Sequence, residues 1–354
     1  MNIEELFPPQ YAKSNVDKIL SSISYAHFKR PSSPLSIIAP AGYGKTHILR
    51  YIAYNRKYRR RYSRLRKIEF IYININEVLI EKVGGANGFI WAPDYAPQTV
   101  ALEKILYRKV INKYQELCKL IKQYPPIPDS WSKDILIGAI EDLVSKFPDK
   151  NFYFIFDDVD KLFQFETISI SNLIKYIRDR YRGSIECIFS INTTRWFEEA
   201  KAESHGEIVN YLTQRTVVLG LMDIKETELY IDNPLMNLYA RYFLHNLPSY
   251  KTKSKRIQEL SGGYLPYKKY LINSITDINR IGMNPALANI SEKLIVSLTS
   301  KQKDILFDFI AGVKVNNSWD LNFLQETGII KRYKSQNILF SPIFKKYLEI
   351  RNRS

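Results

Sequence analysis

Residues 39 to 46 read Ala39-Pro40-Ala41-Gly42-Tyr43-Gly44-Lys45-Thr46. A short apolar segment, Leu35 to Ile38, precedes them, and the spacing of apolar residues predicts a helix from Thr46 to about Arg60. A glycine-rich turn that ends in Lys-Thr and lies between a strand and a helix is typical of a phosphate-binding loop, or P-loop. Ala39 stands where this pattern usually has its first glycine.

Each residue type in this loop has a chemical task. Gly42 and Gly44 allow backbone conformations that direct N–H groups at phosphate oxygens. We expect Lys45 to reach the β- and γ-phosphates and the Thr46 hydroxyl to ligate Mg²⁺. The positive N-terminus of the next helix faces the same anion. The sequence therefore predicts ATP and Mg²⁺ as ligands. The predicted loop contacts are Ala39, Pro40, Ala41, Gly42, Tyr43, Gly44, Lys45, Thr46 and His47.

A second motif reads Phe152-Tyr153-Phe154-Ile155-Phe156-Asp157-Asp158. An apolar strand that ends in paired carboxylates is typical of a Walker B motif. We expect Asp157 to hold Mg²⁺, directly or through water. Asp158 is placed to orient and deprotonate the attacking water, so Asp158 and Lys45 are the predicted catalytic residues. Asp160 competes for the role of base, but a surface or helix-capping position is favoured for it.

A third polar segment, Ser190 to Arg195, follows the predicted strand Ile185 to Ile191. In a sheet of this kind that strand lies between the P-loop strand and the Walker B strand, so its polar tip can sense the γ-phosphate. Asn192 or Thr193 is a candidate to position the water, and Arg195 to contact the phosphate. A plain polar transition from strand to loop is the alternative.

Strands and helices alternate along the first two thirds of the chain. The strands are apolar throughout, as in a parallel sheet that helices cover on both faces. The fold class is therefore α/β, with a P-loop NTPase sheet flanked by helices. Predicted strands are Leu35 to Ile38, Ile68 to Ile75, Phe152 to Phe156, Ile185 to Ile191 and Thr216 to Leu221; predicted helices are Ala12 to Phe28, Thr46 to Arg60, Asp134 to Phe147 and Ser169 to Tyr181.

The predicted NTPase core spans residues 1–222. It carries an insertion at about residues 84–130, which contains a helix from about Thr99 to Gln123. From about Lys225 the pattern is helical as far as Ile329, and a short β-like segment, Ile338 to Phe340, follows. We expect a helical lid domain at residues 223–290 and a further domain at residues 291–354.

These features occur in an order that resembles a family. The P-loop, the acidic pair, Thr193-Thr194-Arg195 and Gly262-Gly263-Tyr264-Leu265-Pro266 resemble the STAND class of signal-transducing NTPases, closely its archaeal-type ATPase branch, and the wider AAA+ class. The resemblance implies that the Thr-Thr-Arg segment senses the nucleotide and that Pro266 packs against the adenine. Two residues separate Pro266 from Gly263, where the tighter pattern has one.

The last part of the chain resembles the winged-helix domain that follows such NTPases. Thr299 to Ala311 corresponds to its first helix, Leu321 to Ile330 to the end of its third, and Ile338 to Phe340 to its wing, with a final helix from Pro342 to Ile350. Only Gly312 to Asp320 remains for the other helices. A shortened recognition helix favours a packing or regulatory role over major-groove readout.

Charge and composition limit the partners. The net charge is +16, and the densest basic run, Arg56 to Lys67, contains two tyrosines that can stack on bases. A solvated surface explains such a run equally well. No apolar stretch is long enough to cross a bilayer and the start lacks a signal-peptide pattern, so we expect a cytoplasmic protein with no membrane partner. Cys118 and Cys187 are expected to be reduced, and we expect no zinc site.

Two function classes follow. The resemblance implies a nucleotide-dependent switch that hydrolyses ATP slowly and cycles between ATP and ADP. Such a switch would control a separate effector or partner protein. Whether the protein forms nucleotide-dependent oligomers is left open by the sequence. The alternative is a DNA-bound AAA+ ATPase, such as an initiator-like loader or a transposition regulator. The net charge and the Arg56 to Lys67 run support this alternative.

Overall fold

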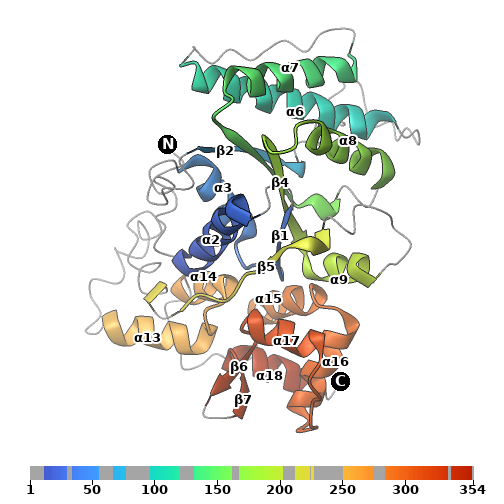
Figure 1. The fold of residues 1–354 in the computed structure, drawn as a ribbon. Coiled ribbons are helices and arrows are strands. Elements are labelled where there is room, and N and C mark those ends of the chain that lie inside the picture. Colours follow the sequence, from blue (N-terminus) through green and yellow to red (C-terminus); the bar gives the residue numbers. More distant parts are fainter. Residues whose placement is uncertain are drawn as a thin grey trace, which may run out of the picture.

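The computed structural model describes residues 12–29, 34–55, 67–76, 96–119, 131–161, 167–201, 212–223, 225–226, 250–273, 284–333 and 336–352 (Figure 1). Most of the basic run, residues 56–66, lies outside these ranges, as does much of the predicted insertion. In the described part of the chain, no helix combines the length and the apolar character needed to cross a membrane.

A five-stranded parallel sheet forms the centre of the NTPase part. Its strands are β1 (Leu35–Ala39), β2 (Ile68–Asn74), β3 (Asn151–Asp157), β4 (Ile185–Asn192) and β5 (Thr216–Val218), in the order β2-β3-β4-β1-β5. As expected, β4 lies between the P-loop strand β1 and the Walker B strand β3. The carboxyl ends of parallel strands meet at one edge, so the loops after β1, β3 and β4 converge there.

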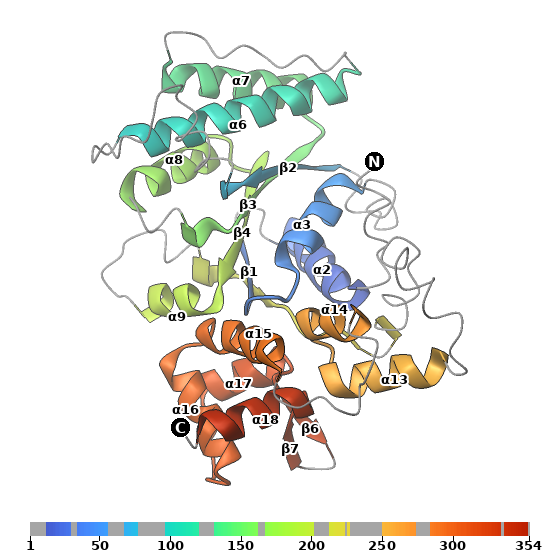
Figure 2. The ribbon, with the colours of Figure 1, turned by 180° about the vertical axis from the view of Figure 1, so that it is seen from behind.

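Helices cover both faces of the sheet (Figures 1 and 2). Along β3, Tyr153 and Ile155 join one apolar core, and Phe152, Phe154 and Phe156 join the other. Helices α2 (Lys13–Lys29) and α3 (Lys45–Tyr54) contribute to the first core; α6 (Ala96–Leu117), α7 (Lys133–Lys146), α8 (Thr167–Arg180) and α9 (Thr193–Lys201) contribute to the second. Burial on both faces explains why the strand sequences are apolar throughout.

The C-terminal part contains helices and one antiparallel hairpin. The elements are α13 (Tyr250–Ser261), α14 (Leu265–Asn273), α15 (Pro285–Val296), α16 (Ser300–Ile310), α17 (Trp319–Glu326), β6 (Ile330–Tyr333), β7 (Gln336–Leu339) and α18 (Pro342–Arg351). Among the described residues, the eight-residue helix α17 is the one helix between α16 and β6. The apolar core on the α2 and α3 side of the sheet continues into these helices.

Several predicted boundaries were wrong. Ile330 was expected to end a helix, but it opens β6. Gly328 follows α17 with a positive φ of 82°, a backbone conformation that ends a helix. The predicted strand Thr216 to Leu221 is only three residues long as β5. The insertion helix begins earlier and ends earlier than expected, and α3 ends at Tyr54, before the predicted Arg60.

The turn between α13 and α14 contacts two segments that are distant in the sequence. Gly262 has a φ of 60°, and a Cβ placed on it would lie 2.0 Å from the carbonyl oxygen of Phe340. Only glycine fits such a close approach. The neighbouring Gly263 carbonyl accepts a hydrogen bond of 3.2 Å from the N–H of Met222, just after the sheet. The turn thus contacts both the NTPase part and the segment before α18.

Candidate nucleotide-binding site

The loop between β1 and α3 has the backbone geometry of a phosphate site. Gly42 and Gly44 have φ values of 84° and 80°, which an L side chain rarely adopts. Gly44 caps α3 without a side-chain hydrogen bond, so the first N–H groups of the helix have no capping side chain to bind. These donors, together with the positive end of α3, favour an anion. Thr46 and the exposed His47 lie in the first turn of α3.

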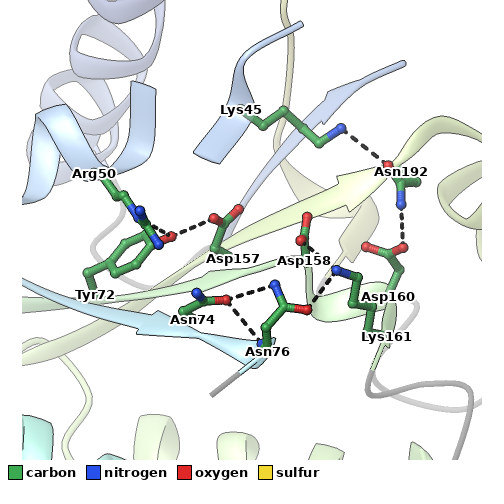
Figure 3. Close-up of polar contacts among 10 residues, drawn as sticks. All are labelled: Lys45, Arg50, Tyr72, Asn74, Asn76, Asp157, Asp158, Asp160, Lys161 and Asn192. Carbon is green, nitrogen blue, oxygen red and sulfur yellow. Dashed lines mark hydrogen bonds and ion pairs between the residues drawn. The ribbon is translucent and has the colours of Figure 1, made fainter. Parts of the chain in front are cut away.

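Lys45 lies at the centre of this site (Figure 3). Its Nζ donates hydrogen bonds to the carbonyl oxygen of Ala39 at 2.7 Å and to Oδ1 of Asn192 at 3.3 Å. Burial lowers the pKa of Lys45, and the carboxylates of Asp160 and Asp158 oppose this change. A phosphate group would stabilise the same buried cation.

The Asp157 carboxylate fits a Mg²⁺ ion. Asp157 is 1% exposed at the end of β3, and its Oδ2 accepts a hydrogen bond of 2.6 Å from the hydroxyl of Tyr72 in β2. Its Oδ1 is buried and has no hydrogen-bond partner among the described residues. A buried carboxylate oxygen with no donor is costly unless a cation or another donor binds it. Asp157 is therefore a suitable ligand for the ion. Thr46, in the first turn of α3, remains the second predicted ligand.

Sequence reasoning missed Tyr72. The hydroxyl of Tyr72 accepts a hydrogen bond of 3.3 Å from Nε of Arg50, whose guanidinium also lies over the tyrosine ring. Figure 3 shows Arg50, Tyr72 and Asp157 in one line from α3 across β2 to β3. A tyrosine within an apolar strand carries no signal of its own, because only the pairing of β2 with β3 brings it to the acidic pair.

Asp158 has an unusual backbone and a cationic neighbour. Its φ is 60°, which is uncommon for a residue other than glycine and occurs often at functional sites. Its carboxylate forms an ion pair of 3.0 Å with Nζ of Lys161, at the end of the short 3₁₀ helix η3 (Val159–Lys161). Lys161 also donates to Oδ1 of Asn76 at 2.8 Å. In this arrangement the predicted base is held by a cation.

The position of Asp160 differs from the one expected from the sequence. The sequence favoured a surface or capping position, but Asp160 is only 6% exposed, and its Oδ2 accepts a hydrogen bond of 2.6 Å from Nδ2 of Asn192. The physical reason is that η3 turns the chain back under the tip of β4. Burial raises the pKa of Asp160, and the hydrogen bond from Asn192 and the charge of Lys45 oppose the rise.

The other residues of the β4 tip have different surroundings. Thr193 is fully buried at the start of α9, and its hydroxyl has no hydrogen-bond partner among the described residues. Arg195 lies in the first turn of α9 and forms an ion pair of 3.5 Å with Glu198 of the same helix. Of the three polar candidates in this segment, Asn192 is the one that bonds to Lys45.

Residues of the C-terminal part pack on the P-loop. A Cβ placed on Gly42 would lie 2.6 Å from the hydroxyl oxygen of Tyr264 and 2.7 Å from Cγ of Pro266. The Tyr264 hydroxyl donates a hydrogen bond of 2.9 Å to the carbonyl oxygen of Ala41. Pro266 therefore lies against the phosphate loop, and glycine is required at position 42 by space as well as by conformation.

No protein-family model and no curated protein sequence matches this chain. Its structure is similar to that of a Walker-type ATPase of Pyrococcus abyssi, with a TM-score of 0.52 and 14% identity over 98% of this chain and 99% of that one. It is also similar to the ORC2 protein of Aeropyrum pernix in its ADP form, with a TM-score of 0.48 and 12% identity over 95% and 94% of the two chains.

A third similar structure is CDC6P of Pyrobaculum aerophilum, with a TM-score of 0.41 and 12% identity over 97% of this chain and 94% of that one. Only the first of these three likenesses has a TM-score above 0.5, and at 14% identity it bears on the fold alone. Together with the five-stranded parallel sheet and the loop after β1, it gives this chain the α/β fold of a P-loop NTPase.

Proposed function

We propose that this protein binds ATP with Mg²⁺, hydrolyses it slowly and acts as a nucleotide-dependent switch that controls a partner protein or assembly. The observation that carries this proposal is the meeting of Lys45, Asp157 and Asn192 at the carboxyl edge of the sheet, beside a loop with two glycines of positive φ (Figure 3). Three segments distant in the sequence thus bring a cation, a carboxylate and a neutral amide together, and phosphoryl transfer depends on positioning and charge stabilisation of this kind.

Each group has a defined role in the proposed reaction. The loop N–H groups and Lys45 bind the β- and γ-phosphates, while Thr46 and Asp157 hold Mg²⁺, which neutralises charge on the phosphates. Asp158 accepts a proton from the attacking water. Its Oδ2 is held in the ion pair with Lys161 at 3.0 Å, so Oδ1 is the oxygen proposed to take the proton. A slow turnover is proposed because a switch needs a long-lived ATP state.

The contacts of the P-loop support the switch. Tyr264 and Pro266 belong to the proposed lid domain at residues 223–290, and they touch the loop that would hold the phosphates. Nucleotide binding and release at this loop would therefore act on the lid. The motif order supports placing the chain in the STAND class within AAA+. The resemblance implies that Pro266 packs against the adenine, and the position of Arg195 after β4 makes it the candidate to contact the phosphates. Nucleotide-dependent oligomerisation fits the same proposal.

Residues 291–354 are proposed as a winged-helix-like domain with a packing role. Trp319 of α17 contacts Trp196 and Phe197 of α9 at ring-centroid distances of 5.3 and 5.4 Å. Phe323 of α17 also contacts Phe197, at 5.1 Å. The helix that precedes the β6-β7 hairpin thus packs on the NTPase part, which favours regulation over reading of DNA.

A DNA-bound AAA+ ATPase is the second candidate. The observation in its favour is the net charge of +16, with a basic run at Arg56 to Lys67. Phosphate contacts from such a run would provide sequence-independent affinity.

The Lys45→Ala variant tests the proposed function. Loss of a charged phosphate contact should weaken ATP binding by about 1.5 to 3 kcal/mol, or roughly 10- to 150-fold, in isothermal titration calorimetry with Mg²⁺. The exposed Lys301→Ala on α16 is the matched control, and it should bind like the wild type. A folded Lys45→Ala protein with unchanged ATP affinity would overturn the assignment.

A further inference from the structure

Asp160 is a buried carboxylate that the proposed roles leave without a task. It lies in η3, two residues beyond Asp158, and is 6% exposed. One of its oxygens, Oδ2, accepts the hydrogen bond of 2.6 Å from Asn192. The other, Oδ1, is buried without a hydrogen-bond partner among the described residues. The hydrogen bond from Asn192 thus joins Asp160 to the polar tip of β4.

The hydrogen bonds fix which way the Asn192 amide faces. Its Oδ1 accepts from Nζ of Lys45 at 3.3 Å, and its Nδ2 donates to Asp160. An ammonium only donates and a carboxylate only accepts, so the opposite orientation of the amide would place donor against donor and acceptor against acceptor. One amide N–H is used by Asp160, and the second remains to donate elsewhere. Figure 3 shows this series from Lys45 through Asn192 to Asp160.

We propose that Asp160 is a positioning residue for ATP hydrolysis, which orients the amide of Asn192 beside Lys45 so that its second N–H donates to the reacting groups. The inference rests on the proposed ATPase function. Asp160 acts through Asn192, and the carboxylate itself does not accept the proton from water. A buried acceptor that fixes a neighbouring amide keeps the site ready for reaction and removes the cost of ordering it in each turnover.

Two features of Asp160 distinguish positioning from general-base catalysis. A general base needs an oxygen within reach of water, but Oδ2 is occupied by Asn192 and Oδ1 is shielded from solvent. Asp158 is the more accessible of the two carboxylates, because its side chain is 22% exposed. The negative charge of Asp160 also lies close enough to favour the charged form of Lys45.

The test compares Asp160→Ala with Asp160→Asn in steady-state ATP hydrolysis. Asp160→Ala removes the acceptor, and we expect kcat to fall about 10- to 100-fold while KM for ATP changes less than about threefold. Asp160→Asn keeps an oxygen that accepts the same hydrogen bond, so kcat should return to within about fivefold of the wild type. Equal large losses of kcat in both variants would mean that Asp160 is the base and would overturn the proposal.

A double-mutant cycle with Asn192→Ala provides the second measurement. If Asp160 acts through Asn192, then Asp160→Ala should have almost no further effect on kcat in the Asn192→Ala background. Additive losses would overturn the proposal. Thermal unfolding checks that the Asp160→Ala protein is folded. If it is not, Asp160→Leu, which fills the space without providing an acceptor, replaces Asp160→Ala in both comparisons. A wild type without Mg²⁺-dependent hydrolysis would overturn the proposed function too, whereas normal kcat in Asp160→Ala overturns only the role of Asp160.

Discussion

The hydroxyl of Tyr43 donates a hydrogen bond of 3.3 Å to the main-chain carbonyl of Thr327, 284 residues along the chain. Tyr43 is part of the phosphate loop, and Thr327 ends α17. The Tyr43 side chain is buried and faces the ring of Tyr264, whose centroid is 6.0 Å away. The loop that would bind phosphate therefore contacts the C-terminal part at two places, Thr327 and Tyr264.

Tyr43→Phe should weaken this connection without emptying the core. The ring remains, so only the hydrogen bond is lost, and we expect the free energy of unfolding in urea to fall by about 0.5 to 1.5 kcal/mol. Tyr107→Phe on α6 is a control far from the loop and should change it much less. Equal stability of the Tyr43→Phe protein and the wild type would show that the contact contributes nothing to holding the parts together.

Asp158→Asn should separate binding from turnover. The variant keeps the size of the side chain but cannot take a proton from water, so kcat should fall by about 100- to 10,000-fold while ATP still binds. Asp157→Asn should in addition weaken the binding of Mg²⁺, because it replaces the carboxylate that is the proposed ligand. The exposed Asp142→Asn on α7 serves as the control in the same assay of phosphate release. Wild-type hydrolysis by Asp158→Asn would place the base elsewhere.

Glu186 should make stability depend on pH. It is buried in β4, and neither carboxylate oxygen has a hydrogen-bond partner among the described residues. Burial raises the pKa of Glu186 from 4.5 to about 7, although Arg178, Arg215 and Arg182 oppose the rise. The folded protein therefore binds more protons than the unfolded chain between these two values. This residue favours folding below its unfolded pKa, and that contribution is lost as pH rises through about 7.

The measurement is urea unfolding of the wild type and Glu186→Gln at about pH 5 and about pH 8. Glutamine cannot ionise, so the wild type should lose up to about 3 kcal/mol relative to the variant across this range. Parallel pH profiles of the two proteins would show that Glu186 does not titrate with a raised pKa.

The basic run Arg56 to Lys67 should bind nucleic acid in a salt-sensitive way. If the run makes six to eight phosphate contacts, raising the salt from about 50 to about 200 mM should lower the affinity for DNA on the order of a thousandfold. Fluorescence anisotropy measures this affinity. Changing Arg59, Arg60 and Arg61 together to Glu should abolish binding. Changing Lys146, Lys293 and Lys301 to Glu alters the net charge equally and should not.

Other results of this binding measurement would assign a different role to the basic run or to the C-terminal domain. Absence of binding by the wild type at the lower salt concentration would assign the positive charge to solubility or to an acidic protein partner. Binding that survives the triple arginine change would place the nucleic-acid surface elsewhere. Strong preference for one DNA sequence would contradict the packing role proposed for α17 and the hairpin.

Local sequence patterns were sufficient for most of the sheet. Each of β1 to β4 is an apolar run next to a turn or a polar tip, and such a run needs no distant residue to be recognised. The hairpin strand β6 was missed because Ile330 to Tyr333 contains Lys331 and Arg332, so its short pattern is not apolar. Its strand pairing with β7 forms only when the chain reverses after Tyr333.

The P-loop and the acidic pair could be identified from residue order, because their chemistry depends on neighbours in the chain. The bonds from Tyr72 to Asp157, Asn192 to Asp160 and Tyr43 to Thr327 join residues separated by 85, 32 and 284 positions. No local pattern encodes these distances. They exist because β2 pairs with β3, because β4 lies between β1 and β3, and because the C-terminal helices pack on the P-loop. Burial in the folded chain therefore decides which polar groups meet.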